Sequence, residues 1–325
     1  MACRTNPLYS PRRRTMKTPS VSIVIPAYNH GHYVAEAVQS ALAQDYPDVE
    51  VIVLDDGSTD DTAKVLAGLS GNFLWQRQKN MGQALTLAKG WASSRGDILG
   101  YLSADDVLGP TAVSAAIVAL EASPSAVAAY PDYLLIDLCS RPVRRVHAPA
   151  FDYRHMLRDV VCLPGPGAFF RRSAYQAAGA WNPSLRQMPD YDFWLRLGLL
   201  GPFVRIPEPL ASFRVHKGSH TYSAASPACA AEPVSIIKNI LKNPSLPPNL
   251  LADGPTALAN AHLTSAQLHL RAGRLRDGLS ATRNALILNA RAVFSVATLR
   301  LLANALFNRL GHQILWRIRS IQNSR

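Results

Sequence analysis

The chain has 325 residues, of which 48% are hydrophobic and 17% are charged. This composition excludes a disordered protein, and the length suffices for one large domain with an appendage or for two domains. The formal net charge of +12 favours an anionic partner: nucleic acid, an anionic membrane surface or a phosphorylated substrate. The four cysteines lie far apart, which argues against a zinc site or a disulfide framework and indicates a reducing compartment.

Residues 1–19 are basic and contain no apolar stretch, so we expect a flexible tail rather than a secretory signal. No apolar run reaches about 18 residues, and no transmembrane helix is predicted. We therefore expect a cytoplasmic location.

Strands and helices alternate between residues 20 and 110. The expected strands are 21–26, 50–54, 73–75 and 97–102, and the expected helices are 33–43, one that begins near Ser58 or Thr59, and 82–92. Strands that alternate with helices in this way are typical of βαβ units. The sequence therefore predicts an α/β fold with a mostly parallel central sheet.

After residue 126 the pattern becomes less regular. It predicts short strands up to residue 146, a loop at 163–167, helices at 172–178 and 190–200, and strands at 203–206 and 210–215. The stretch 219–232 is rich in Ser, Ala and Pro and is a candidate boundary, beyond which everything is expected to be helical. Helices at 257–270 and 275–288 resemble one unit of a tetratricopeptide-like repeat, which we expect to pack on the main domain.

A last helix is expected over residues 293–318. Its apolar side chains fall on one stripe, six arginines accompany it, and no acidic residue follows Asp277. A basic amphipathic helix of this kind indicates peripheral attachment to an anionic membrane surface. The alternative is that the stripe packs on the protein itself or on a second subunit.

Two acidic clusters follow predicted strands. The segment 55–61 contains four aspartates, and Ser103-Ala104-Asp105-Asp106 comes directly after the strand 97–102. Ligands of parallel sheets bind outside the carboxyl ends of the strands, where adjacent carboxylates can hold a divalent cation against a phosphate. A single cluster is equally well explained as a helix N-cap, but two in this arrangement favour a nucleotide-diphosphate site.

Six motifs follow one another along the chain. They are Ser22-Ile23-Val24-Ile25-Pro26-Ala27-Tyr28-Asn29, Val53-Leu54-Asp55-Asp56-Gly57-Ser58-Thr59-Asp60, Asn80-Met81-Gly82-Gln83, Ser103-Ala104-Asp105-Asp106, Pro189-Asp190-Tyr191-Asp192-Phe193-Trp194-Leu195-Arg196 and Phe213-Arg214-Val215-His216-Lys217-Gly218-Ser219. In this order they resemble glycosyltransferase family 2 over residues 20–222. The resemblance implies a GT-A fold with a nucleotide-binding half (20–110) and an acceptor half (111–222), followed by a helical region (223–325).

The resemblance also implies the roles of individual residues. The general base is expected to be Asp190. The metal, Mn²⁺ or Mg²⁺, is expected at Asp105, Asp106 and His216. The nucleotide sugar is expected to contact Pro26, Ala27, Tyr28, Asn29, Asp55, Asp56, Gly82, Gln83, Asp105 and Arg214. Which of Asp55 and Asp56 meets the nucleoside stays open, whereas Asp60 and Asp61 are expected to cap the next helix.

Three positions depart from the pattern of the family. Ser103 stands where an Asp is common, Pro189 replaces the usual Glu before the base, and Leu87 lies where many relatives carry an Arg. Ser103 leaves fewer acidic ligands for a metal. Asp192 becomes the alternative base if the register shifts by two residues.

The resemblance implies an inverting sugar transferase of the hexosyltransferase type that uses a nucleotide-diphosphate donor, with UDP favoured. It is expected to be non-processive, because the Gln-x-x-Arg-Trp motif of processive relatives is absent from the sequence. A lipid-linked or cell-surface glycan is the expected acceptor. The alternative is a decayed, non-catalytic binding protein that uses its helical tail for interactions.

Two further classes are disfavoured. A nucleotidyltransferase normally opens with a Gly-rich loop after its first strand, which Pro26-Ala27-Tyr28-Asn29 is not. Nucleic-acid binding would explain the charge, but the arginines are not interleaved with aromatic residues and no recognition motif is present.

Overall fold

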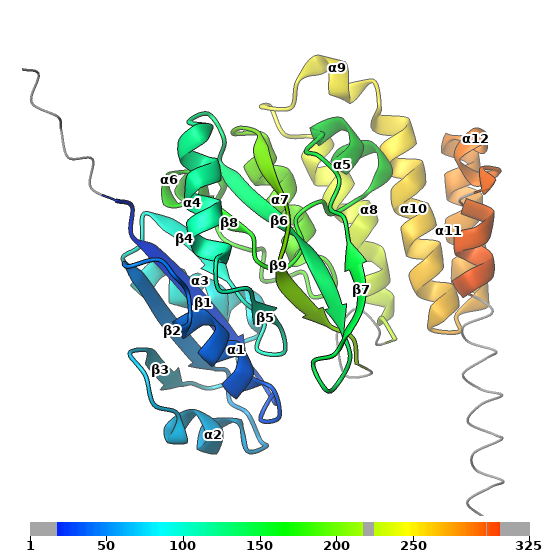
Figure 1. Cartoon of the computed structure of the whole chain (residues 1–325). Coiled ribbons are helices and arrows are strands. Elements are labelled where there is room, and N and C mark those ends of the chain that lie inside the picture. Colours follow the sequence, from blue (N-terminus) through cyan, green and yellow to red (C-terminus); the bar gives the residue numbers. More distant parts are fainter. Residues whose placement is uncertain (1–17, 217–223, 297, 306–325) are drawn as a thin grey trace, which may run out of the picture.

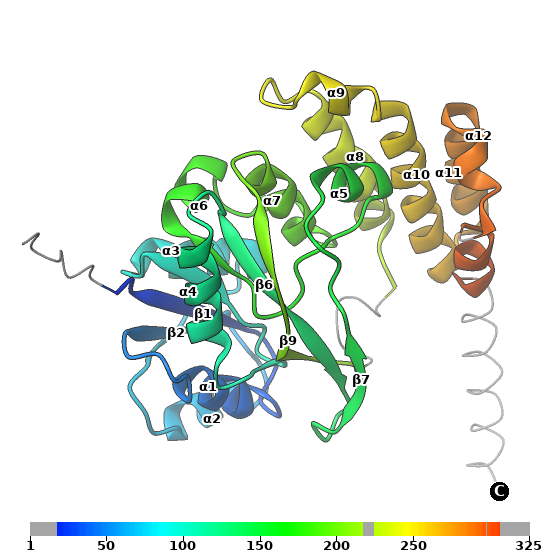
Figure 2. The same cartoon turned by 45° about the horizontal axis from the view of Figure 1, so that its top comes forward.

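The computed structural model describes residues 18–216, 224–296 and 298–305. Within them a single mixed β-sheet runs through the molecule, helices pack on both of its faces, and further helices stand at one end (Figures 1 and 2). The predicted tail (1–19) falls almost wholly outside the described residues. Residues 217–223, and residues 306–318 of the predicted last helix, lie wholly outside them.

The described part of the sheet has nine strands in the order β3-β2-β1-β4-β8-β6-β9-β5, with β7 paired to β6. The strands are β1 (Val21–Ala27), β2 (Val49–Asp55), β3 (Leu74–Arg77), β4 (Ile98–Tyr101), β5 (Val107–Leu108), β6 (Ala128–Ile136), β7 (Pro142–Val146), β8 (Phe169–Arg171) and β9 (Phe203–Arg214). The first four pair in parallel, as the strand–helix alternation predicts, and β8 then joins β4 and β6 in antiparallel fashion.

The helices include every one that the sequence predicts up to residue 288. They are α1 (Val34–Leu42), α2 (Thr62–Gly68), α3 (Gln83–Ser93), α4 (Ala112–Ala122), α5 (Tyr153–Asp159), α6 (Arg172–Ala178), α7 (Pro189–Gly198), α8 (Pro227–Leu241), α9 (Pro248–Leu251), α10 (Gly254–Arg271), α11 (Leu275–Leu288) and α12 (Ala290–Val293). The helix predicted to begin near Ser58 or Thr59 begins later, at Thr62. Asp61 is its N-cap residue, and the Asp60 carboxylate accepts from the Thr62 N–H.

Alternate residues of the central strand β1 feed two hydrophobic cores. Val24 packs into the core that contains α3 and α7, whereas Ile23 and Ile25 pack into the core that contains α1 and α4. All seven residues of β1 are buried. A strand covered on both faces favours apolar residues along its length, which explains the apolar run in the sequence. The polar exception is Ser22, whose hydroxyl donates to Glu50 at 2.6 Å.

The two strands predicted at 203–206 and 210–215 are in fact one strand, β9. It pairs in parallel with β6, and the register shifts around Asp132, opposite the segment that contains Pro207 and Pro209. Proline has no N–H to donate to a ladder, so it is tolerated where the pairing is irregular. The prolines mark a defect within the strand rather than its end.

The helical region shares a core with the acceptor half. Ile236 and Ile237 of α8 and Ala257 and Ala261 of α10 belong to the same buried cluster as α7. Helix α8 begins at Pro227, so the prediction of a boundary that extends to residue 232 is wrong; proline at the first helical position is favourable. None of the described helices is long and apolar enough to cross a membrane.

The predicted helix hairpin is confirmed as α10 and α11, which pack against each other beside α8 and α5. Helices α11 and α12 lie at the far end of this group, away from the sheet (Figures 1 and 2). The last helix does not begin at Val293 as predicted: α12 ends there, and residues 298–305 are helical after a short turn.

Candidate active site

A cavity of about 1110 Å³ opens at the carboxyl ends of β1 and β4. Its lining includes the segments 26–30, 80–84, 101–106, 162–166 and 185–187, together with Pro189, Asp190 and His216. Thus residues from 20–110 and residues from 111–222 line one space together. Of the predicted site residues, only Asp55 and Arg214 do not line this cavity.

Asp55 and Asp56 differ sharply in their surroundings. Asp55 is fully buried; one carboxylate oxygen accepts from the Ser58 N–H at 2.9 Å and the other lies 3.5 Å from Arg77 Nε. Asp56 lies at the cavity wall, where its carboxylate accepts from the backbone N–H groups of Met81 and Gly82 at 2.9 and 2.8 Å. Asp56 therefore fixes the wall of the cavity before helix α3.

Backbone geometry explains why Gly and Asn stand at positions 82 and 29 of the sequence motifs. Gly82, the N-cap residue of α3, has φ +86°, a left-handed conformation that glycine adopts without steric cost. Asn29 also has a positive φ of 57°, and its side-chain oxygen accepts from the Thr59 N–H at 2.7 Å. Asn29 thereby ties the end of β1 to the loop that follows Asp55, so its side chain organises the cavity edge.

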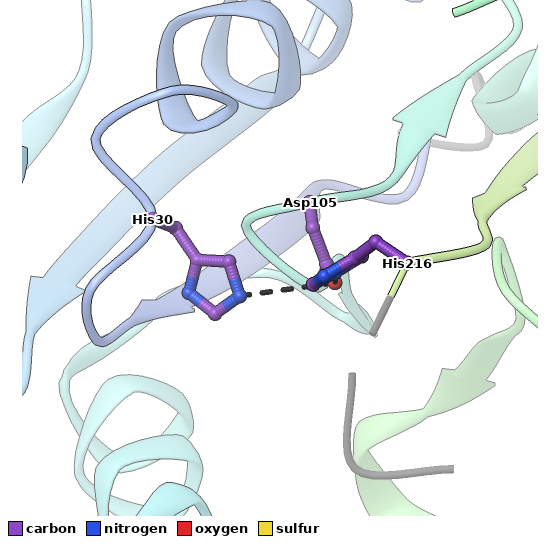
Figure 3. A group of neighbouring side chains, drawn as sticks. All are labelled: His30, Asp105 and His216. Carbon is purple, nitrogen blue, oxygen red and sulfur yellow. Dashed lines mark hydrogen bonds and ion pairs between the residues drawn. The ribbon is translucent and has the colours of Figure 1, made fainter. Parts of the chain in front are cut away.

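Three side chains from distant parts of the chain converge beside the cavity (Figure 3). His216 Nε2 lies 2.8 Å from an Asp105 carboxylate oxygen, and His30 Nε2 lies 3.7 Å from the same oxygen. One donor atom from each residue falls within 4.8 Å of the others. Burial disfavours the ionised carboxylate, but the hydrogen bond and charge of His30 and the hydrogen bond of His216 outweigh it and lower the pKa of Asp105 to about 2.

This donor set fits a divalent transition-metal ion. Imidazole and carboxylate groups together suit Mn²⁺ and its neighbours better than Mg²⁺, which prefers oxygen ligands alone. His30 was not predicted as a ligand; its place directly after Asn29 was the only signal in the sequence. Asp106, which was predicted as a ligand, lines the cavity but lies outside this group.

Asp106 and Arg214 form a buried support behind the cluster. An Asp106 carboxylate oxygen accepts from the Arg214 backbone N–H at 3.0 Å. Burial and the neighbouring charge of Asp105 raise the pKa of Asp106 well above its ordinary value. The Arg214 side chain is 1% exposed and points to Glu36 and the β6–β7 turn. The geometry therefore does not support a direct contact between Arg214 and the donor, because its guanidinium is directed into the protein.

Asp190 also lines the cavity, from the first turn of α7. One carboxylate oxygen lies 3.9 Å from the Cys162 thiol. Burial raises the pKa of Asp190, and the charge of Glu232 raises it further against the lowering effect of nearby hydrogen bonds. The alternative base, Asp192, is not at the cavity; its carboxylate forms an ion pair with Arg196 at 2.8 Å.

Comparison with known proteins places the chain in a family. The family model "Glycosyl transferase family 2" matches residues 22–178. The chain is 30% identical over 224 residues to an uncharacterized glycosyltransferase of Rickettsia prowazekii, a match that covers 65% of this chain and 69% of that protein. The chain therefore belongs to glycosyltransferase family 2, and it is a glycosyltransferase of that family.

More distant relatives share part of the sequence or the fold. A chondroitin synthase of Escherichia coli is 32% identical over 211 residues, which is 63% of this chain but only 30% of the synthase. TarS of S. aureus in complex with UDP-GlcNAc superposes with a TM-score of 0.59 at 19% identity, covering 89% of this chain and 80% of that structure. A Pyrobaculum calidifontis mannosyltransferase with GDP-Man and Mn²⁺ gives 0.56 at 20%, covering 91% and 88%. These structures confirm the predicted GT-A fold.

Proposed function

We propose that this glycosyltransferase moves a sugar from a nucleotide-diphosphate donor to a hydroxyl group of a glycan acceptor, with inversion at the anomeric carbon. The observation that carries the proposal is a single cavity that both Asp105 and Asp190 line. We assign the donor to a first wall at Asp105 and the acceptor to a second wall at Asp190. A donor held against the first wall exposes the face of its sugar that points towards the second. One space can thus hold donor and acceptor in line.

In this proposal Asp190 is the general base. Its ionised carboxylate takes the proton of the acceptor hydroxyl while that oxygen attacks the anomeric carbon. The bond to the donor diphosphate breaks on the opposite face, and the electron pair leaves with the diphosphate. A raised pKa strengthens a carboxylate as a base, since proton transfer is most effective when the pKa approaches the working pH.

The first wall is suited to the donor diphosphate. His30, Asp105 and His216 would hold the divalent metal, and such an ion neutralises charge on the departing diphosphate. Tyr28, which is 46% exposed at the cavity edge, offers an aromatic face to the nucleobase of the donor. The metal proposal gains support from the Mn²⁺ in the mannosyltransferase that shares the fold.

The identity of the donor and acceptor is inferred by analogy. One structure that shares the fold holds UDP-GlcNAc and another holds GDP-Man. We favour a UDP-sugar as the donor, and the experiment below tests both uridine and guanosine nucleotides. Two matched relatives are a chondroitin synthase and a hyaluronan synthase by name, which supports a glycan acceptor. We propose a lipid-linked or cell-surface glycan, and a cytoplasmic protein that attaches to the inner face of the membrane.

The described helices offer support for membrane attachment. Leu279, Ile287, Phe294 and Val296 are each more than 60% exposed at the end of the molecule formed by α11 and α12. Arginines lie among them, as in basic amphipathic surfaces that bind anionic lipid. Retention of the protein in the soluble fraction at low salt after cell lysis would contradict this part of the proposal.

A thermal-shift panel tests the donor. UDP, dTDP, GDP and CMP are compared with and without Mn²⁺, since a ligand at a hundred times its Kd adds about 2.7 kcal/mol to stability. We expect a metal-dependent shift with UDP. If the folded protein responds to no nucleotide, the site has decayed and the chain is a binding protein.

The Asp190→Asn variant tests the base. It should keep metal-dependent nucleotide binding but lose sugar transfer to the acceptor, because the amide cannot accept the hydroxyl proton. Asp192→Asn is the matched control on the same helix. Transfer that survives in Asp190→Asn and disappears in a folded Asp192→Asn would assign the role to Asp192 instead.

A further inference from the structure

A buried carboxylate of the helical region lies against the loop that precedes the proposed base. Glu232 of α8 accepts hydrogen bonds from three successive backbone N–H groups: Arg186 at 2.7 Å, Gln187 at 2.8 Å and Met188 at 2.9 Å. Its side chain is 6% exposed. Helix α8 lies beside α7 in both views (Figures 1 and 2).

The local sequence explains why this carboxylate is needed. Helix α7 starts at Pro189, which has no N–H, and the three preceding residues lie before the helix, so their N–H groups take no part in its hydrogen bonds. A carboxylate can accept about four hydrogen bonds, so one Glu satisfies all three donors. The carboxylate also lies at the N-terminal end of α7, where the helix dipole is positive.

We infer that Glu232 is a positioning residue for the base. It holds the loop 186–188 in place, and that loop fixes the first turn of α7, from which Asp190 projects into the cavity. The inference rests on the proposed function, because it needs Asp190 to act in transfer. It gives the helical region a part in the reaction, although the residues matched by the family model end at 178.

Glu232 also acts on Asp190 through its charge. Among the described residues, the Cys162 thiol, the Tyr101 hydroxyl and the Glu232 carboxylate interact with Asp190, and none of these three groups carries positive charge. A neutral residue at position 232 removes a negative charge that raises the pKa of Asp190. Because the base must be ionised, the rate of transfer rises with pH through the pKa of Asp190. Without the negative charge of Glu232 this pKa is lower, so the acidic limb of the pH–rate profile moves to lower pH.

Glu232→Gln tests the inference, with Asp253→Asn as the matched control. Asp253 is a carboxylate of the same helical region and is 8% exposed. It forms a two-point ion pair with Arg154 of α5 at 2.6 and 3.0 Å and does not touch the loop. Both variants thus remove a buried charge between the same two parts of the molecule. The measurements are kcat, KM for the donor, the pH profile and hydrogen exchange of the amides 186–188.

For Glu232→Gln we expect kcat to fall by about tenfold or more, because small misplacements of a catalytic group are costly, while KM for the donor stays within about twofold. The acidic limb should move to lower pH, and exchange at 186–188 should accelerate. Asp253→Asn should show none of these effects. If Glu232→Gln instead follows the control in kcat and pH profile, its role is structural and the inference is overturned.

Two further outcomes remain decisive. The first is measured in the unaltered protein, so it holds even if Glu232→Gln fails to fold. If the amides 186–188 exchange there at unprotected rates, Glu232 does not hold the loop and the inference is overturned. A protein without transfer activity towards any donor would overturn the proposed function, and hydrogen exchange would still show whether Glu232 holds the loop. The two failures are therefore distinguishable.

Discussion

Replacement of Arg214 by Met distinguishes a structural role of this residue from a direct contact with the donor. In the structure its guanidinium donates to the Asp105 carbonyl oxygen at 2.8 Å and to the Asp137 carbonyl oxygen at 3.0 Å. It also bonds a Glu36 carboxylate oxygen at 2.6 Å and lies 4.7 Å from the centre of the Tyr33 ring. The side chain therefore joins α1, the turn before β5 and the β6–β7 turn at one point.

The cost of the Arg214→Met change follows from these partners. Methionine keeps the apolar stem but leaves the two carbonyl oxygens without their donor, at about 1–3 kcal/mol each. The ion pair with Glu36 adds less than a fully buried pair would, because that carboxylate is 42% exposed and screened by solvent. Since the methionine offsets part of the loss by packing, we expect the free energy of unfolding to fall by about 3–4 kcal/mol.

Urea unfolding followed by tryptophan fluorescence measures this loss. Arg141→Met is the control, because its guanidinium is 76% exposed and pairs with Asp137 on the same turn; it should leave the unfolding midpoint unchanged. The reasoning is refuted if Arg214→Met unfolds at the urea concentration of the unaltered protein but binds nucleotide diphosphate more weakly. That result would mean that the guanidinium faces the donor, as the family resemblance implies.

Three further predictions concern the core, the pH dependence and the metal. Trp91→Ala removes a side chain that is fully buried among aromatic rings, and equilibrium unfolding should show a loss of about 3–5 kcal/mol. Burial opposes ionisation of Asp132, but hydrogen bonds led by that of Arg205 outweigh this effect and lower the pKa of Asp132. The ionised carboxylate therefore stabilises the fold above the unfolded pKa of about 3.9, and this stabilisation is lost as the pH falls through the lower folded pKa. The unfolding curves of Asp132→Asn and of the unaltered protein should converge as the pH falls below about 4. His30→Gln should weaken Mn²⁺ binding in a titration followed by electron paramagnetic resonance, whereas His32→Gln, two residues on, should not.

The fold of residues 20–110 could be predicted well because the signals in this segment are local. Apolar runs, helical spacing and acidic strand ends lie next to one another in the sequence, and the structure places β1, β2, α3 and β4 within a few residues of the expected bounds. The short helix α6 was predicted with its exact bounds, Arg172–Ala178. In such segments propensity and tertiary packing favour the same conformation.

The features that the sequence did not reveal depend on contacts between distant residues. Arg214 pairs with Glu36, 178 positions earlier, and no local pattern shows that a guanidinium beside a proposed active site points inwards. The start of α8 was hidden because Pro227 and Pro233 indicate a linker, whereas burial of Ile236 and Ile237 stabilises the helix. His30 was overlooked because its partners, Asp105 and His216, come near it only in the folded chain.

The same long-range contacts explain how one cavity can serve two substrates. The wall proposed for the donor is assembled from the loop after β1, the turn before β5 and the end of β9, and Arg214 locks these segments together from behind. The wall proposed for the acceptor depends on α7, and Glu232 of α8 accepts hydrogen bonds from the loop directly before that helix. A buried charged side chain that does not itself line the cavity thus supports each wall. The distance between the metal cluster and Asp190, on which in-line attack depends, is then set by the packing of the halves and the helical region on a shared core.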